Sequence, residues 1–482
     1  MAARRALPMP MYFGPRYTLS LPDAHRFPME RYERVRSLFL AQCGGDRSLF
    51  ELRRPPHELA TTRAVTRAHC ADFVRRFVAG ELDRKAERAI GFPWSPALVA
   101  RTRDITGATL AATRDVLRPS PAGAPPVPVA CNMAGGTHHA MADRGEGFCI
   151  WNDIAVAAKA ALCPMGGGDG GGGGGVGGGG DDGRSSGGGD SDCGIGAWSA
   201  ADYASRLLAD GAGGGSGSGV SGGAAAAPGT NSKSRSSSGS SSSSSSGGNG
   251  SSGSGSVDVH QVLVLDLDVH QGNGTASICA NDPRIFTYAR SLAMTSTFSS
   301  STHSPIPSPL SFPTHYSTCC NTHTHTTRYS LHADSNYPWS TRVAGDLDVA
   351  LPDDVTDDAY CAELSESLRL VEARLAGQHG EAAPPGAGGA EGRRGPPPWC
   401  QLLFFQAGVD PLKEDRLGNL SLSREGLQRR NAIVLEFVRR HAIPCVITMG
   451  GGYSRPIDAT AQAHVDVFAE AARTCRSIQL AR

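Results

Sequence analysis

Short, largely apolar runs alternate with longer amphipathic stretches along most of the chain. The apolar runs are residues 127–131, 262–267, 282–288, 402–406 and 445–449. Runs of this length that are bounded by turn-forming residues are typical of buried strands. Apolar residues at helical spacing predict helices over 60–79, 96–117 and 427–440, one of roughly 20 residues from Asp357, and one opened by Pro28. This alternation predicts an α/β fold, with an open, mostly parallel sheet flanked by helices on both faces.

Three stretches interrupt this pattern. Residues 164–256 are mainly glycine and serine, residues 289–329 are rich in serine, threonine, histidine and proline, and residues 377–398 are rich in glycine and proline. The first stretch cannot bury enough apolar surface to offset the entropy lost on ordering, so we expect a disordered insertion. We expect the second to be another insertion and the third a linker. The rest of the sequence, from residue 12 to residue 482, is then a single domain.

The charge and cysteine content narrow the possible partners and compartments. Lys and Arg together number 46, as do Asp and Glu, so nothing suggests bulk attraction to nucleic acid or to an anionic membrane. No stretch reaches the roughly 18 to 20 consecutive apolar residues of a membrane helix, and no secretory signal is evident. Thirteen cysteines then favour free thiols in a reducing compartment. We expect an intracellular protein, in the nucleus or the cytoplasm.

Side chains that can bind a metal ion follow the predicted strand at 262–267. Asp266, Asp268 and His270 alternate along the extended chain, so their side chains share one face. A carboxylate and an imidazole that project together suit a divalent metal, and mixed oxygen and nitrogen ligands suit zinc. Acidic residues at a strand end also cap helices and form turns, so this stretch alone leaves both interpretations open.

Three other predicted strands also end in glycine and a reactive group. These groups are the pair His138 and His139, then Asp410, then Tyr453. In an open parallel sheet, active residues gather beyond the carboxyl ends of the strands. We therefore expect all of these groups to meet at one edge of the sheet, in a single metal site.

This set of side chains suits the hydrolysis of an amide. Three metal ligands, with positions left for water and substrate, are typical of catalytic zinc; here they are Asp268, His270 and Asp410. His139 can take the proton of the attacking water and protonate the departing amine. Tyr453 can donate a hydrogen bond to the oxyanion. Asp266 can orient His138.

Other histidines are interpreted differently. His25 and His69 lie near predicted helices, where an isolated histidine more often packs or caps than binds a ligand. His323 belongs to the run THTHT at 322–326, but its surroundings lack periodicity and contain many prolines. We therefore assign none of these three residues to the metal site.

Five motifs together resemble the zinc-dependent histone deacetylase superfamily, and most closely its class IV-like and bacterial-type members. They are PDAHRFPMERY at 22–32, GGTHHAMADRGEGFC at 135–149, LDLDVHQGNG at 265–274, QAGVDPLKEDRLGNLSLS at 406–423 and GGGY at 450–453. The resemblance covers the chain from about residue 12 onward, apart from the low-complexity stretches. It implies the arginase/deacetylase fold, a sheet between layers of helices, which agrees with the parallel sheet predicted above.

The resemblance also implies roles for individual residues. Zinc would bind the three ligands named above, the second histidine of the pair, His139, would be the main proton-transfer group, and Tyr453 would polarise the acyl carbonyl. Gly147, Phe148 and Gly451 would contact the substrate, the first two as walls of a tunnel for an acyl-lysine side chain. A structural potassium ion would bind, mostly through main-chain oxygens, near Asp266, Asp268 and His270.

Two features depart from the superfamily pattern. Many relatives have an aspartate where this chain has Asn273, and that carboxylate pairs with the second histidine, so His139 should be a weaker base here. The HQGNG form is nonetheless the one that class IV-like members show. Relatives also continue from a strand like RIFTY almost directly into SLHADSNYP, so we interpret residues 289–329 as an insertion or an error in the gene model.

Three functions are compatible with these observations. The first is zinc-dependent hydrolysis of acetyl or longer acyl groups from lysine side chains of histones or other proteins. The second is hydrolysis of acetylated polyamines on the same fold, and the third is a degenerate fold that serves as a binding module. An arginase-like two-manganese site is disfavoured, because it needs a further carboxylate where this chain has Gln271, Gly272 and Asn273.

Overall fold

The computed structural model describes residues 6–23, 25–44, 46–119, 125–162, 259–287, 329–333, 336–379 and 399–481. The predicted insertion at 164–256 and residues 289–328 and 380–398 lie outside the described residues, and so does His323. The described residues belong to one compact unit. Among their helices, none is long and apolar enough to cross a membrane.

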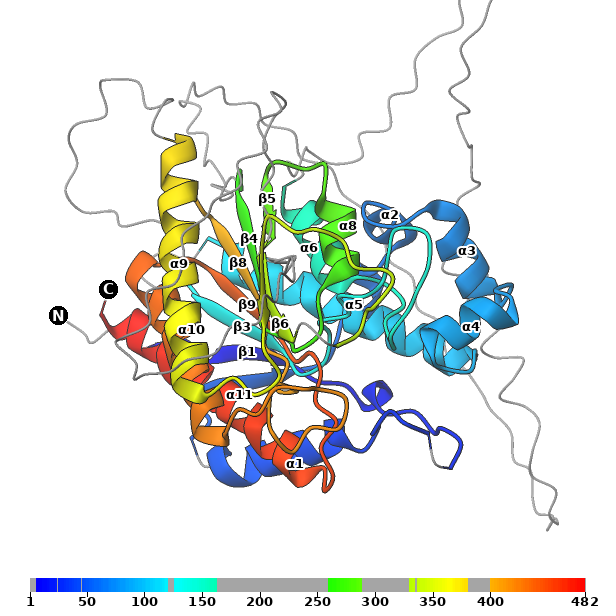
Figure 1. The fold of residues 1–482 in the computed structure, drawn as a ribbon, viewed down its shortest axis with the longest axis horizontal. Helices are drawn as coiled ribbons and strands as arrows, with labels where there is room; N and C mark the ends of the chain where they lie inside the picture. Colours follow the sequence, from blue (N-terminus) through cyan, green and yellow to red (C-terminus); the bar gives the residue numbers. More distant parts are fainter. Residues whose placement is uncertain are drawn as a thin grey trace, which may run out of the picture. The chain divides into compact units, whose positions relative to one another are not determined.

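A parallel sheet runs through the centre of this unit (Figure 1). Its strands, among the described residues, are β1 (Met9–Tyr12), β2 (Phe50–Arg53), β3 (Val129–Asn132), β4 (Val262–Asp266), β5 (Ile285–Thr287), β6 (Tyr329–Ala333), β7 (Leu347–Leu351), β8 (Leu402–Gln406) and β9 (Cys445–Thr448). Neighbouring strands follow the order β2-β1-β3-β9-β8-β4-β6-β7, and β5 also pairs with β4. Every pairing is parallel. The open parallel sheet predicted from the sequence is therefore confirmed.

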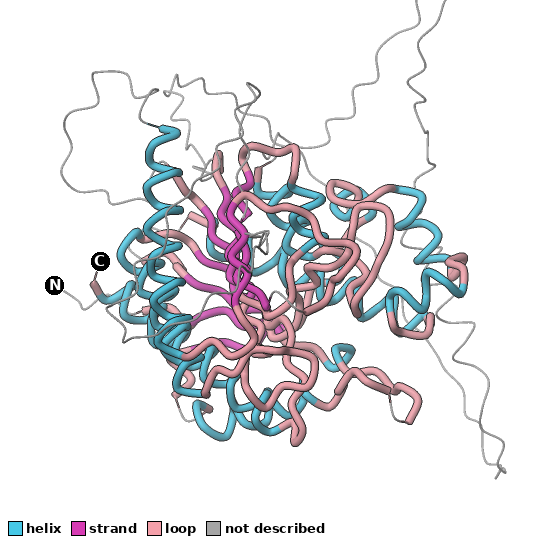
Figure 2. The backbone as a smooth tube through the Cα atoms, in the orientation of Figure 1, coloured by secondary structure: helices cyan, strands magenta, loops and turns pink. Residues whose placement is uncertain are grey.

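Helices cover both faces of this sheet, and Figure 2 shows the strands as one stack between them. On one face lie α1 (Arg31–Cys43), α9 (Asp357–His379), α10 (Arg424–His441) and α11 (Asp458–Leu480). On the other lie α5 (Pro96–Leu117), α6 (Asp153–Ala161) and α8 (Asn273–Cys279). Shorter helices precede α5: α2 (Thr62–Val65), α3 (Ala71–Ala79) and α4 (Arg84–Ile90), with 3-10 turns at Pro15–Tyr17 and His57–Leu59.

The central strands are buried on both faces, which explains their continuous apolar sequences. Every residue of β3, β4, β8 and β9 is buried. Phe404 and Phe405 are neighbours on β8, so their side chains point to opposite faces, and both are 0% exposed. A strand with two buried faces needs a helical layer on each side, and this places the carboxyl ends of these strands inside the protein.

Side-chain caps set several helix starts. Ser95 accepts a hydrogen bond from the backbone N–H of Leu98 at 3.1 Å, so α5 begins where the sequence predicts. Asn152 accepts one from Ala155 at 3.0 Å and caps α6, which begins at Asp153. Ser423 accepts from Gly426 at 3.0 Å, and α10 therefore begins at Arg424, before the predicted start. The predicted helix opened by Pro28 is α1, whose first residue is Arg31.

The prediction of one helix over residues 60–79 is wrong, because the chain breaks there between α2 and α3. The backbone N–H of Cys70 donates to the carbonyl of Ala142 at 2.7 Å. His69 is buried, with Nδ1 2.9 Å from the carbonyl of Met141, and its Nε2 accepts from the backbone N–H of Asn152 at 2.8 Å. These bonds outside the helix hold the chain in a non-helical conformation at the break.

Two predicted boundaries also change. The sheet already includes Met9, which lies before the predicted domain start at residue 12. Helix α9 continues to His379, so the first residues of the predicted linker at 377–398 are helical. Neither change alters the order of the elements.

We expect the buried His69 to make folding stability depend on pH. Burial lowers the pKa of His69 to about 4, below its value in an unfolded chain. The unfolded state therefore binds more protons between about pH 6.5 and 4, so the free energy of unfolding falls as pH falls through this window, by roughly 3 kcal/mol in full. Urea titrations at several pH values, compared with His69→Gln, should show a shallower decline for the variant. Equal pH slopes in the two proteins would contradict this assignment.

Strands β5 and β6 pair with the same strand, β4, in one continuous register. Val264 lies opposite Thr287, and Asp266 lies opposite Ser330, so a single position of β4, Leu265, separates the two pairs. One residue would suffice to join Thr287 to Ser330 in an unbroken strand. In the chain, residues 288–329 separate them. We propose on this ground that residues 289–329 interrupt what is otherwise one strand.

A variant without residues 289–329 should therefore fold. Tyr288 would then join Ser330 and lie opposite Leu265, and the entropy of closing the long excursion, on the order of 3 kcal/mol, would no longer oppose pairing. We expect an equal or higher midpoint of thermal unfolding by circular dichroism. If residues 289–329 come from a gene-model error, peptide mass spectrometry of the native protein should detect no peptide from this stretch. Loss of the folded state in the deletion variant would overturn the single-strand interpretation.

Candidate active site

Three metal-binding side chains converge at the carboxyl ends of two paired strands. Asp268 and His270 follow β4, and Asp410 follows β8, which pairs with β4 along its whole length. All three are buried, and one ligand atom from each lies within 4.8 Å of the others. His270 Nδ1 lies 3.0 Å from Asp268 Oδ1 and 3.1 Å from Asp410 Oδ2. The predicted ligand set is thus brought together.

The charges of this group fit a divalent cation. Burial and the charge of Asp268 raise the pKa of Asp410 to about 7. Burial alone would lower the pKa of His270, but hydrogen bonds to Asp268 and Asp410 raise it to about 10. Two buried carboxylates around one imidazole thus need a positive charge between them, which a proton or a metal ion can supply. Oxygen and imidazole ligands together suit zinc.

Backbone groups hold the two carboxylates in place. The N–H of Gly451 donates to Asp268 at 2.7 Å, and the N–H of Val269 donates to Asp410 at 2.9 Å. A Cβ atom at Gly451 would lie 1.9 Å from the Oδ2 of Asp410, so only glycine fits there. Gly451, predicted as a substrate contact, thus lies directly against the ligands.

Arg430 of α10 fastens the two strand ends behind the ligands. It is 0% exposed, and its guanidinium donates to the carbonyls of Leu267 at 3.3 Å and Gly408 at 2.5 Å. Each carbonyl lies one or two residues from a ligand. The buried guanidinium therefore links the segments that carry Asp268 and Asp410.

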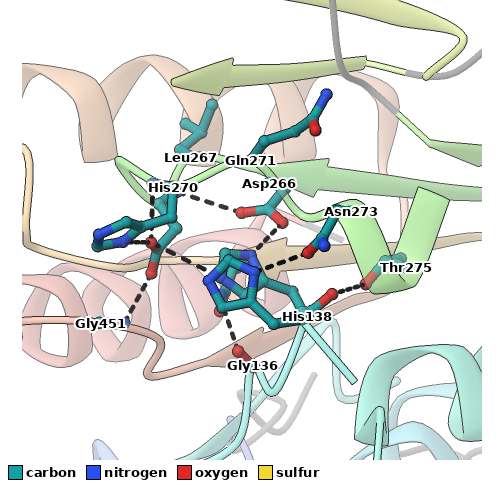
Figure 3. A network of polar contacts seen from close by, with 12 residues as sticks. Gly136, His138, Asp266, Leu267, His270, Gln271, Asn273, Thr275 and Gly451 are labelled. Carbon is teal, nitrogen blue, oxygen red and sulfur yellow. Dashed lines mark hydrogen bonds and ion pairs between the residues drawn. The ribbon is translucent and has the colours of Figure 1, made fainter. Parts of the chain in front are cut away.

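The two consecutive histidines lie beside these ligands but have different partners. Figure 3 shows His138 with Asp266, His270 and Asn273 around it. The two histidine rings lie 4.1 Å apart. His138 Nδ1 lies 2.7 Å from Asp266 Oδ2, which is the contact predicted from the sequence. His139 Nδ1 lies 2.8 Å from Asn273 Oδ1. A carboxylate therefore faces one ring and a neutral amide faces the other.

These partners give the histidines opposite charge preferences. Burial would lower the pKa of His138, but the charges of Asp266 and Asp268 raise it to about 9. Burial lowers the pKa of His139 well below its usual range, and the charges of His138 and His270 lower it further. At neutral pH the pair thus favours a charged His138 beside a neutral His139.

Tyr453 lies beside the ligands, with its ring centroid 6.4 Å from that of His270. Its backbone N–H donates to Asp415 at 2.5 Å, and the guanidinium of Arg31 lies 5.4 Å from the ring centroid. Burial raises the pKa of Tyr453 well above its usual range. The phenol therefore stays protonated and can donate a hydrogen bond.

All of these residues lie in segments that match a known family. The histone deacetylase domain matches residues 25–166, 254–299 and 398–470, which together are more than half of the chain. The chain belongs to the histone deacetylase family. The resemblance recognised in the sequence motifs is therefore confirmed, including the fold class it implied, and family membership supports a hydrolase.

Two similar proteins extend the comparison. An uncharacterized protein of a Picosynechococcus species is 24% identical over 448 residues, which cover 93% of each chain. Among solved structures, an acetylpolyamine aminohydrolase from Burkholderia pseudomallei is 15% identical, with a TM-score of 0.49 and coverage of 96% of this chain and 98% of the other. Neither similarity identifies the substrate of this deacetylase-family chain.

One cavity of this deacetylase-family domain joins the predicted site residues. Its lining includes His138, His139, Gly147, Phe148, Asp268, His270, Gly451 and Tyr453. Phe148 packs edge-on against Phe27, with ring centroids 5.1 Å apart. A Cβ atom at Gly147, where φ is +58°, would lie 2.7 Å from the His139 ring and 3.1 Å from the ring of Tyr337. A larger residue at position 147 would clash with both rings, so glycine is needed there.

Other residues of the site were not singled out in the sequence. Tyr337 packs edge-on against His139 with ring centroids 4.9 Å apart, and Glu146 bonds to Asn273. Both belong to quoted motifs, SNYP and GEGFC, but no local pattern distinguishes them from loop residues. His25 and His69 make packing and backbone contacts, as expected: His25 stacks on Phe92.

We expect Gly451→Ala to lower the affinity for a divalent metal ion, tested with zinc, by about 10- to 100-fold, because the new methyl group would displace both carboxylates. Competition with a chromogenic chelator measures this affinity. Gly377→Ala is a matched control, because a Cβ atom at Gly377 on α9 meets nothing within 4 Å. Equal zinc affinity in the two variants would show that the ligands do not depend on the close approach at Gly451.

Proposed function

We propose that this protein hydrolyses acetyl or longer acyl groups from lysine side chains of proteins, including histones, with zinc as its cofactor. The observation that carries this proposal is the pair His138 and His139. Two adjacent buried imidazoles with opposite charge preferences share one cavity with Asp268, His270 and a protonated phenol, and Asp410 lies next to these two ligands. Hydrolysis of an amide needs a metal site, a base, an acid and an oxyanion donor, and this cavity offers a candidate for each.

Zinc would be held by Asp268, His270 and Asp410. When bound, it would lower the pKa of a coordinated water to roughly 7 and polarise a carbonyl oxygen. A structural potassium ion near the main chain of residues 266–270 is also part of the proposal, on the ground of the family resemblance.

Proton transfer is assigned to the histidines. His139 favours the neutral form and accepts the proton of the attacking water, then passes it to the departing lysine amine. His138, held charged by Asp266, keeps a positive charge next to the developing negative charge. This division of roles follows from the different partners of the two rings.

Tyr453 is assigned to the oxyanion. Its phenol is buried near the ring of His270, and because burial raises the pKa of Tyr453 well above its usual range, the phenol is protonated at neutral pH. A donor held in a buried cavity stabilises a developing oxyanion more strongly than it does in water.

The walls of the cavity favour an alkyl amide as the substrate. Phe148, Phe27 and Gly147 provide apolar and aromatic surface, which suits the methylene chain of an acyl-lysine. An acylated polyamine has a similar chain, so the choice between the two substrates depends on groups outside this narrow part of the cavity.

We expect Tyr453→Phe to keep its zinc and to lose about 10²- to 10³-fold in turnover, because one oxyanion donor is removed. Asp268→Ala should lose both zinc and turnover. Metal analysis and a fluorogenic acetyl-lysine peptide assay measure the two quantities. The matched control is Tyr12→Phe. Tyr12 lies on β1, outside the site, and its phenol donates a hydrogen bond to Asp115 of α5, so this variant should keep full turnover. Full activity in Tyr453→Phe would remove the oxyanion assignment.

The substrate is tested with the zinc-loaded wild-type protein. Lysine peptides with acetyl or long-chain acyl groups, and acetylated polyamines, are compared by kcat/KM. The proposal expects the highest value for an acyl-lysine peptide. A higher value for acetylpolyamines would transfer the assignment to small amines, and no turnover of any of these amides would favour a binding module.

A further inference from the structure

We propose that Glu146 is a positioning residue for His139 and acts through the side-chain amide of Asn273. Nothing in the family match assigns a role to this glutamate. The inference deepens the proposed hydrolase function and rests on it for the role of His139. The choice of Glu146 rests on the hydrogen bonds around Asn273.

The hydrogen-bond chain is short and buried. His139 Nδ1 lies 2.8 Å from Asn273 Oδ1, and Asn273 Nδ2 donates to Glu146 Oε1 at 2.7 Å. Asn273 is 0% exposed and Glu146 is 7% exposed. The sequence led us to expect His139 to lack a carboxylate partner. A carboxylate is present after all, one residue further from the ring.

The neighbours of Asn273 fix the orientation of its amide. Besides Glu146, the carbonyl oxygen of Thr341 accepts from Nδ2 at 3.0 Å. Both hydrogens of the amide nitrogen therefore have acceptors. A flipped amide would place Oδ1 against a carboxylate and a carbonyl, which repel it. Oδ1 must then face His139.

This orientation selects one tautomer of His139. Asn273 Oδ1 can only accept a hydrogen bond, so Nδ1 of His139 must carry the hydrogen. The other ring nitrogen, Nε2, is then free of its proton and can act as the base. Glu146 thus determines, through one intervening amide, which nitrogen of His139 is the base.

Glu146 is itself held at fixed positions. Thr341 donates from its hydroxyl to Oε1 at 2.9 Å, and Arg144 Nε lies 3.6 Å from Oε2. Burial and the charge of Glu146 raise the pKa of Tyr337, whose ring packs against His139. Thr341 and Arg144 both present hydrogen-bond donors to the carboxylate of Glu146. They therefore hold this carboxylate in a position where it can accept from Asn273.

A charge-swap experiment tests this arrangement. Glu146→Gln removes the charge but preserves the shape, and Asn273→Asp creates a second carboxylate 2.7 Å from the first. We expect each single variant to lose about 10- to 100-fold in kcat with KM and zinc content unchanged. The double variant places a carboxylate directly on His139 and an amide beside it. It should recover to within about threefold of wild type. Glu58→Gln, whose side chain is 68% exposed, is the matched control.

A second readout does not depend on activity. In zinc-loaded, substrate-free protein, 15N NMR of the histidine rings reports which nitrogen carries the hydrogen. We expect the Nδ1–H form of His139 in wild type and in the double variant, and a mixture of tautomers in Glu146→Gln. Additive losses in the double variant, or an unchanged tautomer in Glu146→Gln, would overturn the role of Glu146. A wild-type protein with this tautomer but no turnover would instead contradict the hydrolase proposal.

Discussion

The pairing of β4 with β8 is the interaction on which the site depends. The two strands run side by side in register from Val262 and Leu402 to Asp266 and Gln406, so the residues that follow them emerge next to each other. Asp410, which is far from Asp268 and His270 in the chain, thereby becomes their buried neighbour. Each would be costly to bury alone, and together they form a group that only a positive charge can satisfy. Because β4 and β8 are neighbours in the sheet, the fold brings two buried carboxylates together at a position that favours a cation.

The same edge of the sheet gives two identical side chains different chemistry. His138 and His139 are adjacent in sequence and equally buried, yet one faces the carboxylate of Asp266 and the other faces the amide of Asn273. Histidine titrates close to neutral pH, so a change of partner is enough to separate the two protonation states. The difference between them is set by the short segment from 266 to 273, which also supplies two metal ligands. Two of the candidate metal ligands and the partners of both histidines therefore come from one short segment of the chain.

The sequence predicted the site better than it predicted the outline of the fold. Asp268, His270 and Asp410 follow strongly apolar runs, and the rule that parallel strands end at one edge is enough to bring them together. Strands β1 and β2 and helix α11 are among the elements that were missed. MPMY is short and contains a proline, which is unusual within a strand, FELR is half charged, and the small residues of α11 leave only a weak pattern. The break at His69 comes from bonds to the distant loop at 141–152, which periodicity cannot reveal.

Glu146 shows a further limit of local patterns. Its contact with Asn273 joins a loop to the first residue of α8, far away in the sequence, and the motif that contains it reads as an ordinary glycine-flanked turn. The sequence did show that an aspartate expected beside His139 was absent. It could not show where a compensating carboxylate lies, because that depends on how the loop with Glu146 packs against the start of α8.

Arg430 separates the rigid part of the site from the part that can change. By anchoring the carbonyls of Leu267 and Gly408 to α10, it ties the metal-binding side chains to the sheet and a helix. The aromatic residues Phe148 and Tyr337, in contrast, come from connecting segments that can accept substitutions and altered lengths. Over evolution, changes in these connecting segments can therefore alter the lining of the cavity, while Arg430 keeps Asp268 and Asp410 in place.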